Sequence, residues 1–342
     1  MRAQPYLENI MSKTLKYIGV PIALLGIAAL ASTAQAEKKT FISIGANPVG
    51  LTAYQWAAGI SDLANRKVNG IKANAEATKG YVANIRLLLN KKIEAGFSNS
   101  KVAYDAYAAK GAYKNDKPGQ ILSWISVAPI AMHVFTLEGS PIKTLQDLKG
   151  KRVGMGQPGG TSMLDAETLF SAIGLTPGKD FKDFRIKLGK QVNMLGDGQL
   201  DAAIWNGSMP LPPVIKLKAR RKVSFIEIPD AISAKIRKKS PPYYEYNIPA
   251  NTYPAQPNAI NSYGLGNVLL VRADVSEKVV YGMTKAIMEN LGHMKSVHPA
   301  WGKVSKATIL RGFSAPLHPG ALKYYREAYV PGIEDFAKRT AK

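Results

Sequence analysis

Residues 152–173 read RVGMGQPGGTSMLDAETLFSAI and contain, in order, a strand pattern, a glycine-rich loop and a helix pattern. Residues 152–156 form a short run typical of a strand, and Met163, Ala166, Phe170 and Ile173 recur at helical spacing. A strand that leads through a tight loop into a helix is the repeating unit of α/β proteins. This stretch therefore predicts an α/β fold if the same order recurs elsewhere.

The same order does recur along the chain. Apolar or alternating runs predict strands at residues 41–46, 71–77, 123–137, 184–188, 202–205, 223–228 and 267–272. Helical spacing predicts helices at 53–63, 82–89 and 322–336, and one long amphipathic helix over 279–294. Residues 241–261 are rich in Pro, Tyr and Asn without periodicity, which predicts a surface loop. The alternation of strands and helices predicts an α/β architecture with mostly parallel sheets.

The first 36 residues have the order of a secretory signal. Lys13 and Lys16 precede the apolar residues 18–30, and the small-residue site Ala34-Gln35-Ala36 follows. The apolar run is too short to span a membrane, so we predict export to a bacterial periplasm with cleavage after Ala36. The alternative is an uncleaved N-terminal anchor.

The sequence contains no cysteine, which excludes disulfides, thiolate metal sites, a catalytic thiol and a lipid-modified cysteine. We therefore expect the exported protein to diffuse freely, as a monomer. The formal charge is +22, and loss of Arg2, Glu8, Lys13 and Lys16 leaves +20. Export removes nucleic acid as a partner, so this charge points to anionic solutes or the anionic membrane surface. The basic runs 220–222 and 235–239 are interpreted as solvated faces.

No residue pattern indicates catalysis. The histidines, at positions His133, His293, His298 and His318, have spacings that suggest neither a metal site nor an acid–base pair. Aspartate and glutamate are too scattered to indicate a pair of catalytic carboxylates. We therefore expect structural histidines, no metal, no cofactor and a protein that is not an enzyme.

Loops between predicted strands and helices are the candidates for ligand binding, because open α/β sheets bind ligands at the carboxyl ends of their strands. In the loop at 156–162, glycines let the backbone approach a ligand, and the free amides of the next helix favour an anion. The alternative for this loop is an ordinary N-cap with a tight turn. The candidate ligand-binding residues are Asn47, Tyr54, Thr78, Lys79, Asn84, Asn99, Ser100, Lys101, Gln157, Gly159, Gly160, Thr161, Ser162 and Trp205.

A set of short stretches also matches one known family in order and approximate spacing. These are IGAN at 44–47 with Tyr54, EATKG at 76–80, NIRLL at 84–88, Ser100 with VAYDAY at 102–107, LQDLKGKRV at 145–153, GQPGGTS at 156–162, GQLDAA at 198–203 and IPANTY at 248–253. On these stretches, nearly the whole mature chain resembles the TAXI type of solute-binding subunit of tripartite ATP-independent periplasmic (TRAP) transporters.

The resemblance implies a type II periplasmic-binding-protein fold, in which two α/β lobes joined by crossing strands enclose a ligand cleft and close by hinge motion. The expected lobes are residues 37–129 with 264–342, and residues 130–263. Members with known ligands bind glutamate or other small carboxylates and deliver them to membrane permease subunits driven by an ion gradient. The alternatives are the binding component of an ATP-driven importer, a ligand-sensing module for a membrane receptor, and a periplasmic enzyme.

The chain departs from the family pattern at several candidate positions. Residues 47–51 replace a flexible run of glycines and threonines, Lys79 replaces a glycine, and Lys101 replaces an aspartate. Ser208 replaces another glycine and is the last candidate ligand-binding residue. If Lys79 and Lys101 both face the cleft, we expect a solute more anionic than an amino acid, such as a dicarboxylate or keto acid.

Overall fold

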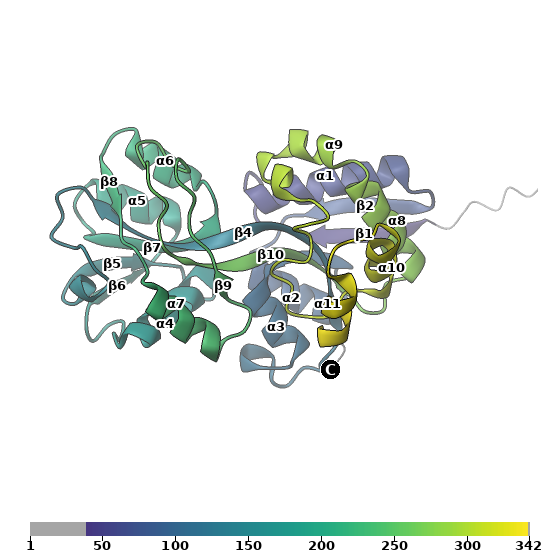
Figure 1. The fold of residues 1–342 in the computed structure, drawn as a ribbon, viewed down its shortest axis with the longest axis horizontal. Coiled ribbons are helices and arrows are strands. Elements are labelled where there is room, and N and C mark those ends of the chain that lie inside the picture. The colour runs from purple at the N-terminus through teal and green to yellow at the C-terminus, as the bar shows by residue number, and fades with distance from the viewer. Residues whose placement is uncertain (1–38, 341–342) are drawn as a thin grey trace, which may run out of the picture. The chain divides into compact units, whose positions relative to one another are not determined.

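The computed structural model describes residues 39–340, so the predicted signal peptide and its cleavage site lie outside the described residues. The strands are β1 Thr40–Gly45, β2 Ile71–Glu76, β3 Ala95–Asn99, β4 Ile121–Leu137, β5 Arg152–Met155, β6 Lys182–Arg185, β7 Ala202–Ser208, β8 Val223–Phe225, β9 Tyr244–Glu245 and β10 Tyr263–Arg272 (Figure 1). The α-helices are α1 Thr52–Lys67, α2 Tyr81–Leu89, α3 Ser100–Tyr107, α4 Thr161–Ile173, α5 Leu188–Gly196, α6 Pro212–Lys218, α7 Asp230–Lys239, α8 Glu277–Met288, α9 Leu291–Val297, α10 Pro319–Glu327 and α11 Ile333–Thr340. Short 3-10 helices are η1 Gly111–Tyr113, η2 Gln146–Leu148 and η3 Pro299–Lys303. Within residues 39–340, no helix is both long enough and apolar enough to span a lipid bilayer.

The strands form one sheet in the order β2-β1-β3-β10-β4-β7-β5-β6, with β8 beside β4 and β9 beside β10. The sheet is parallel where β1 pairs with β2 and β3, and where β5 pairs with β6 and β7. In the middle, β10 runs antiparallel to β3 and β4, and β4 runs antiparallel to β7. The prediction of mostly parallel sheets is therefore wrong for the centre, because two long strands link the parallel parts and run in opposite directions.

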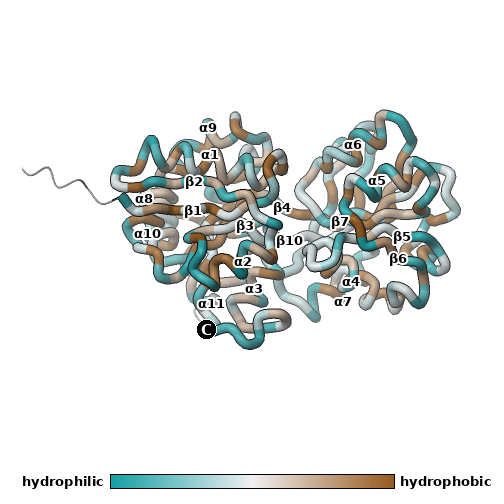
Figure 2. The backbone as a smooth tube through the Cα atoms, turned by 180° about the vertical axis from the view of Figure 1, so that it is seen from behind, coloured by the Kyte–Doolittle hydropathy of each residue, from teal (hydrophilic) through white to brown (hydrophobic). Residues whose placement is uncertain are grey.

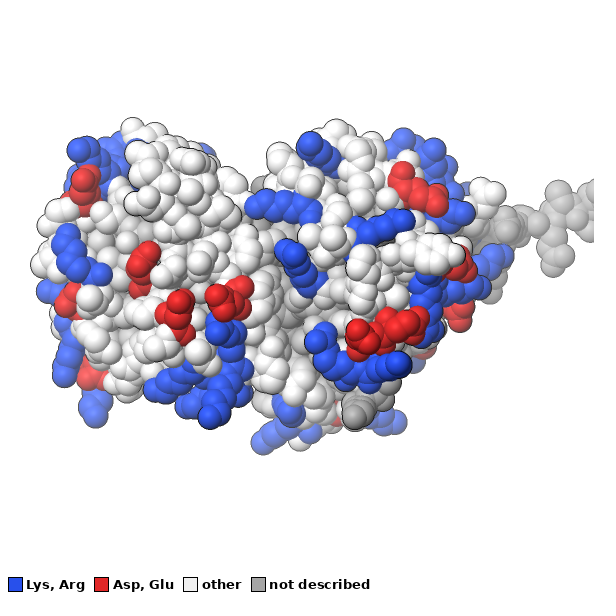
Figure 3. All heavy atoms as spheres, viewed as in Figure 1, with Lys and Arg blue, Asp and Glu red and all other residues white. Residues whose placement is uncertain are grey.

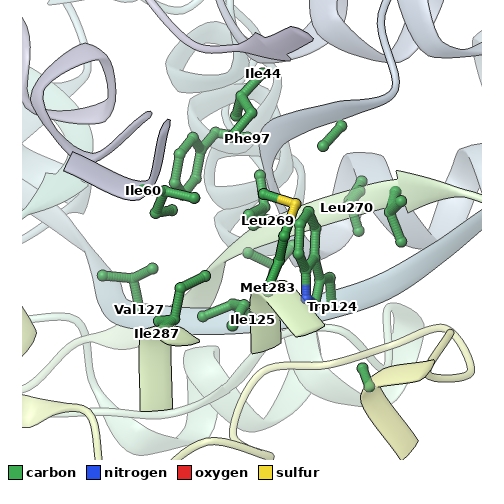
Figure 4. Packing of buried hydrophobic residues seen from close by; sticks show 14 of the residues in the cluster. Ile44, Ile60, Phe97, Trp124, Ile125, Val127, Leu269, Leu270, Met283 and Ile287 are labelled. Atoms are coloured by element: carbon green, nitrogen blue, oxygen red, sulfur yellow. The ribbon is translucent and has the colours of Figure 1, made fainter. Parts of the chain in front are cut away.

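The first core region packs helices against β1, β2 and β3. Its largest buried side chains include Trp56 of α1, Phe97 of β3 and Trp124 of β4, each no more than 1% exposed. Figure 4 shows Trp124 beside Leu269 and Leu270 of β10, with Met283 and Ile287 of α8 packed near them. Helices α1 and α8 belong to this region because their apolar residues recur at helical spacing and cover the sheet.

The second core region lies on both faces of the sheet around β4, β5 and β7. Ile130 and Val134 of β4 join a cluster with α4, while Ala131 and Phe135 join a cluster with α5 and α6 on the other face. Successive side chains of a strand point to opposite faces, so one strand supplies both clusters. The two core regions share β4 and β10, whose other ends belong to the first core region. Figure 2 shows the hydrophobic segments of each region lying inward.

Several predicted elements differ from the structure. The predicted helix over 279–294 is broken into α8 and α9 at Asn290, whose side-chain Nδ2 donates to the carbonyl of Ala286, 2.8 Å away. The predicted strand at 184–188 ends at Arg185, and Leu188 begins α5. Leu188 is buried in the second core region, so its apolar character serves a helix rather than a strand. Helices α3, α5, α6 and α7 and strand β3 are not predicted above, and the loop at 241–261 contains the short strand β9.

Candidate functional site

The carboxyl ends of β1, β2 and β3 meet around the buried side chain of Asn84. Its Nδ2 donates to the carbonyls of Ala46, at 2.7 Å, and Phe97, at 2.8 Å. Its Oδ1 lies 2.6 Å from the Thr78 hydroxyl, which also lies 2.8 Å from the Ala46 carbonyl. Asn84 has no exposed surface. The Asn84 side chain therefore fixes the start of α2 against the ends of the three strands. Its amide nitrogen and oxygen are already hydrogen-bonded, so neither is available to a ligand.

The loop from β5 into α4 is shaped by close packing at Gly156. A Cβ on Gly156 would lie 2.8 Å from the Cβ of Ser162 and closer still to the backbone nitrogen of Met163. Gly159 has φ of +72°, a left-handed conformation that favours glycine. The hydroxyl of Ser162, inside the first turn of α4, donates to the Oδ1 of Asn206 on β7. The loop therefore places the start of α4 against the carboxyl end of β7.

Side chains from both core regions meet at one point, which we call the central junction and define by Tyr81, Asn267 and Ser208. The Nδ2 of Asn267 on β10 donates to the Tyr81 hydroxyl, 2.8 Å away, and lies 3.3 Å from the Ser208 hydroxyl. Tyr81 begins α2 and packs against clusters in both core regions. One residue before Asn267 in β10, the backbone N–H of Gly266 donates to the Ser100 hydroxyl at 3.0 Å. The candidate residues Ser100 and Ser208 therefore both bond to β10 or its side chains.

Two buried amide atoms at this point have no hydrogen-bond partner among residues 39–340. They are the Nδ2 of Asn99 and the Oδ1 of Asn267, in side chains no more than 2% exposed. Asn99 and Asn267 pair directly across β3 and β10, so their side chains point to the same face of the sheet. One is an unused donor and the other an unused acceptor, and each costs about 1–3 kcal/mol when left unpaired.

A groove of about 470 Å³ opens beside this region, between α3 and η1 on one side and α4 and α7 on the other. The candidates Lys101 and Thr161 line it from the starts of α3 and α4. The Lys101 ammonium is bonded to Asp105, one turn further along α3. The positive charge of Lys101 is therefore largely neutralised by its own helix.

Asp165 is the buried acid at the floor of the groove. The Tyr243 hydroxyl donates to its Oδ1 at 2.5 Å, and the Asn206 side-chain amide donates to its Oδ2. Burial raises the pKa of the Asp165 carboxyl to about 7, and the Tyr243 hydrogen bond, the Lys101 charge and Asn206 oppose that shift only in part. Asp165 is therefore protonated in the folded protein at pH values where an exposed aspartate is ionised.

Substitution of Asp165 by asparagine is expected to remove a pH dependence of stability. Above about pH 4 the unfolded chain releases the Asp165 proton, whereas the folded protein keeps it until about pH 7. The native protein therefore loses stability as pH rises through this window, and Asp165→Asn does not. The measurement is urea unfolding of both proteins across the window, in which the free energy of unfolding of the variant should rise relative to wild type. A difference that stays constant with pH would contradict the assignment.

The remaining candidate residues lie in the two core regions and in loops at strand ends. Tyr54 packs against the first core region, and Trp205 packs against the second. Lys79 is exposed, and the structure gives it no bond to the central junction. The half-buried Asn47 and the loop residues Gln157, Gly159 and Gly160 lie at strand ends, as expected from their positions after β1 and β5.

The residues that join the two core regions were mostly not among the candidates. Tyr81, Asn206, Tyr243 and Asn267 come from separate elements and meet only through the fold. Asn267 carries a signal that could have been used, because it is a polar residue in the otherwise apolar run GLGNVLLV. A buried amide in such a strand indicates a specific hydrogen-bonding role.

Three of the four histidines bond to backbone groups or to a tyrosine, and the fourth, His293, is partly exposed with its Nε2 3.6 Å from the Asp62 carboxylate. His133 is buried and lies 2.9 Å from the Ala131 carbonyl and 2.9 Å from the Tyr253 hydroxyl, and burial lowers its pKa to about 4. His298 and His318 accept hydrogen bonds from backbone N–H groups at helix starts. Among the described residues, no group of three or more His, Cys, Asp or Glu side chains is placed to hold a metal ion.

Several solved structures are similar in fold to this chain. A binding protein component of an ABC phosphonate transporter from Pseudomonas aeruginosa has a TM-score of 0.50 and 16% identity, covering 77% of this chain and 79% of that chain. A protein from Xanthomonas citri bound to chloride has a TM-score of 0.49 and 12% identity, covering 86% of this chain and 99% of that one. An ancestral arginine-binding protein bound to arginine has a TM-score of 0.47 and 16% identity, covering 77% and 99%.

The sheet order, the two core regions sharing β4 and β10, and the likeness to the Pseudomonas protein define a type II periplasmic-binding-protein fold, which confirms the predicted fold class. The model of the NMT1-like family matches residues 44–328, and the chain belongs to that family.

Proposed function

We propose that this chain is a periplasmic solute-binding protein of a transport system and that its solute binds at the central junction. The observation that carries this proposal is the pair of buried, unpartnered amide atoms, Asn99 Nδ2 and Asn267 Oδ1. A solute that accepts from one and donates to the other would satisfy both. The position also fits, because it lies where strand ends of both core regions converge.

The two core regions are the lobes of this proposal, with residues 37–129 and 264–342 in one lobe and 130–263 in the other. The strands β4 and β10 cross between them and are the natural hinge. A solute bonded to groups from both lobes binds the closed arrangement better than the open one. It therefore shifts the population toward closure.

The proposed solute is a small organic anion, such as a glutamate-like molecule, a dicarboxylate or a keto acid. A glutamate-like molecule would satisfy both amide atoms, because its ammonium group donates to Asn267 Oδ1, whereas an ionised dicarboxylate or keto acid would accept from Asn99 Nδ2 alone. The formal charge of +22 supports an anion, and Lys101 stands at the edge of the groove. Because Asp105 already pairs with Lys101, an anion would have to compete for that ammonium or take its hydrogen bonds from neutral groups. The loop amides at the start of α4 are such neutral donors.

The proposed transporter is a TRAP-type permease, which rests on the resemblance to the TAXI type. The second candidate is an ATP-driven importer, because the similar Pseudomonas protein is named as a component of an ABC transporter. The genes beside this one would distinguish the two. A large multi-span permease without an ATPase supports the first, and an ATPase supports the second.

The binding function is tested by mass spectrometry of what co-purifies with the protein, followed by thermal shift against carboxylates and neutral amino acids. A small anion that co-purifies and raises the melting temperature is the expected result. Tighter binding of neutral amino acids would reject the anionic solute while keeping the binding function. Turnover of the bound molecule would reject the binding function.

Asn267→Ala is expected to weaken binding of the identified solute by at least tenfold, because it removes both the acceptor and the Nδ2 donor at the central junction. Isothermal titration calorimetry measures the dissociation constant. Asn258→Ala is the control, since Asn258 is exposed and its side chain makes no hydrogen bond recorded in the described structure. An unchanged affinity in Asn267→Ala would place the solute elsewhere.

A further inference from the structure

The groove between α3 and α7 has a lysine-rich rim on each side. On one side, Gly111 and Ala112 of η1 line the groove, Lys110 directly precedes η1, Lys114 directly follows it, and Lys117 comes three residues later. On the other side, Lys239 lines the groove from the end of α7, with Lys235 and Lys238 on the same helix. These six lysines are exposed. Figure 3 shows basic side chains gathered over the end of α7 and below α3.

The carboxylates near these rims already have partners. Asp105 is paired with Lys101, and Asp116 with Arg86 at 2.7 Å. Glu167 lies 3.9 Å from Arg185, which also pairs with Asp183 at 2.7 Å, and Glu245 lies 3.7 Å from Arg237. The exception is Asp230 at the start of α7, which is more than two turns from Lys239 and more than one turn from Lys235. None of the six rim lysines forms an ion pair within residues 39–340, so both rims carry uncompensated positive charge.

The floor between the rims is partly apolar. Leu164 of α4 is 42% exposed there, and Val102 and Ile236 lie on either side. A flat anionic membrane could approach the rims but would leave a recessed apolar floor uncovered. An extended chain that carries acidic side chains on both sides of an apolar one would pair with the rims and cover Leu164 together.

We propose that this groove binds an acidic, extended segment of a partner protein, with carboxylates toward both lysine rims and an apolar side chain over Leu164. The rim after α3 belongs to the first core region and the rim on α7 to the second. A segment that contacts both rims therefore holds the two core regions at one separation. The partner can thereby distinguish one arrangement of the protein from another.

The test uses a fluorescent peptide in which leucine is flanked by glutamates, and an identical peptide with glutamine in their place. Anisotropy at about 0.15 M salt measures binding, so that long-range attraction is screened. We expect only the acidic peptide to bind. The triple variants Lys110→Glu/Lys114→Glu/Lys117→Glu and Lys235→Glu/Lys238→Glu/Lys239→Glu should each weaken it at least tenfold.

The matched control is Lys295→Glu/Lys303→Glu/Lys306→Glu, which makes the same charge change on α9 and the segment after it, on the opposite side of the molecule from α3 and α7 (Figure 1). This variant should weaken binding less than twofold. If all three variants lost the same affinity for the acidic peptide, the net charge of the protein would explain the binding, and the proposed site would be wrong. Rim-dependent binding to anionic phospholipid vesicles, with no binding of the acidic peptide, would also overturn it. Melting temperatures of the variants confirm that each still folds, and this test does not require the solute to be known.

Discussion

Gly156→Ala is expected to lower the free energy of unfolding by about 3 kcal/mol and to weaken solute binding at the same time. The added Cβ meets the backbone nitrogen of Met163 and the Cβ of Ser162, and neither can move without shifting the start of α4. Ser162 is also bonded to Asn206, so the shift would pass to the carboxyl end of β7. Urea unfolding measures the stability, and calorimetry measures the affinity for the solute.

The control for this variant is Gly189→Ala in α5, where an added Cβ meets no atom within 4 Å. Alanine favours the helix more than glycine does, so stability should stay constant or rise by up to about 1 kcal/mol. If Gly156→Ala were as stable as this control, the close packing of the loop against α4 would be wrong.

Asn84→Ala is expected to destabilise the protein by about 3 kcal/mol. The substitution leaves a cavity and removes the donor to the carbonyls of Ala46 and Phe97, in a place without solvent access. Because the Ala46 carbonyl directly follows β1, the Phe97 carbonyl lies within β3 and Asn84 also bonds to Thr78, the loop that contains Thr78 and the start of α2 should also become less ordered. Hydrogen exchange of the backbone amides in 78–84 reports that loss directly.

Asn90→Ala is the matched control, since Asn90 is exposed at the end of the same helix. Its effect on stability should be within about 0.5 kcal/mol. A similar loss in both variants would show that helix α2, rather than the buried hydrogen bonds, determines the result.

The parts of the fold that follow from local pattern could be predicted from the sequence. The spacing of Trp56, Ile60 and Leu63 predicts α1, and the alternation in 71–77 predicts β2, because each element has one face turned to the core. The antiparallel centre could not be predicted in this way. It depends on how β4 and β10 pair, and neither strand contains a signal for its partner's direction.

The candidate site was predicted only in part for the same reason. Loops after strands can be found one at a time, and that reasoning led to Thr78, Ser100 and Ser162. The contact of Tyr81 with Asn267 joins residues far apart in sequence and on different elements. Only the assembled sheet brings them together, and only burial shows that the Asn267 Oδ1 is left without a partner.

The long strands also determine when the chain can fold. Strand β10 lies between β3 and β4 in the sheet. Ile121 at the start of β4 pairs with Arg272 at the end of β10, and the other edge of β10 pairs with β3. During synthesis, residues 39–137 therefore emerge before the strand that must lie between β3 and β4. Pairing across such a sequence separation is slow because the closing loop is long. We expect the nascent chain to remain unfolded until most of its length has been made, which is the state in which a protein can be threaded through a narrow translocation channel.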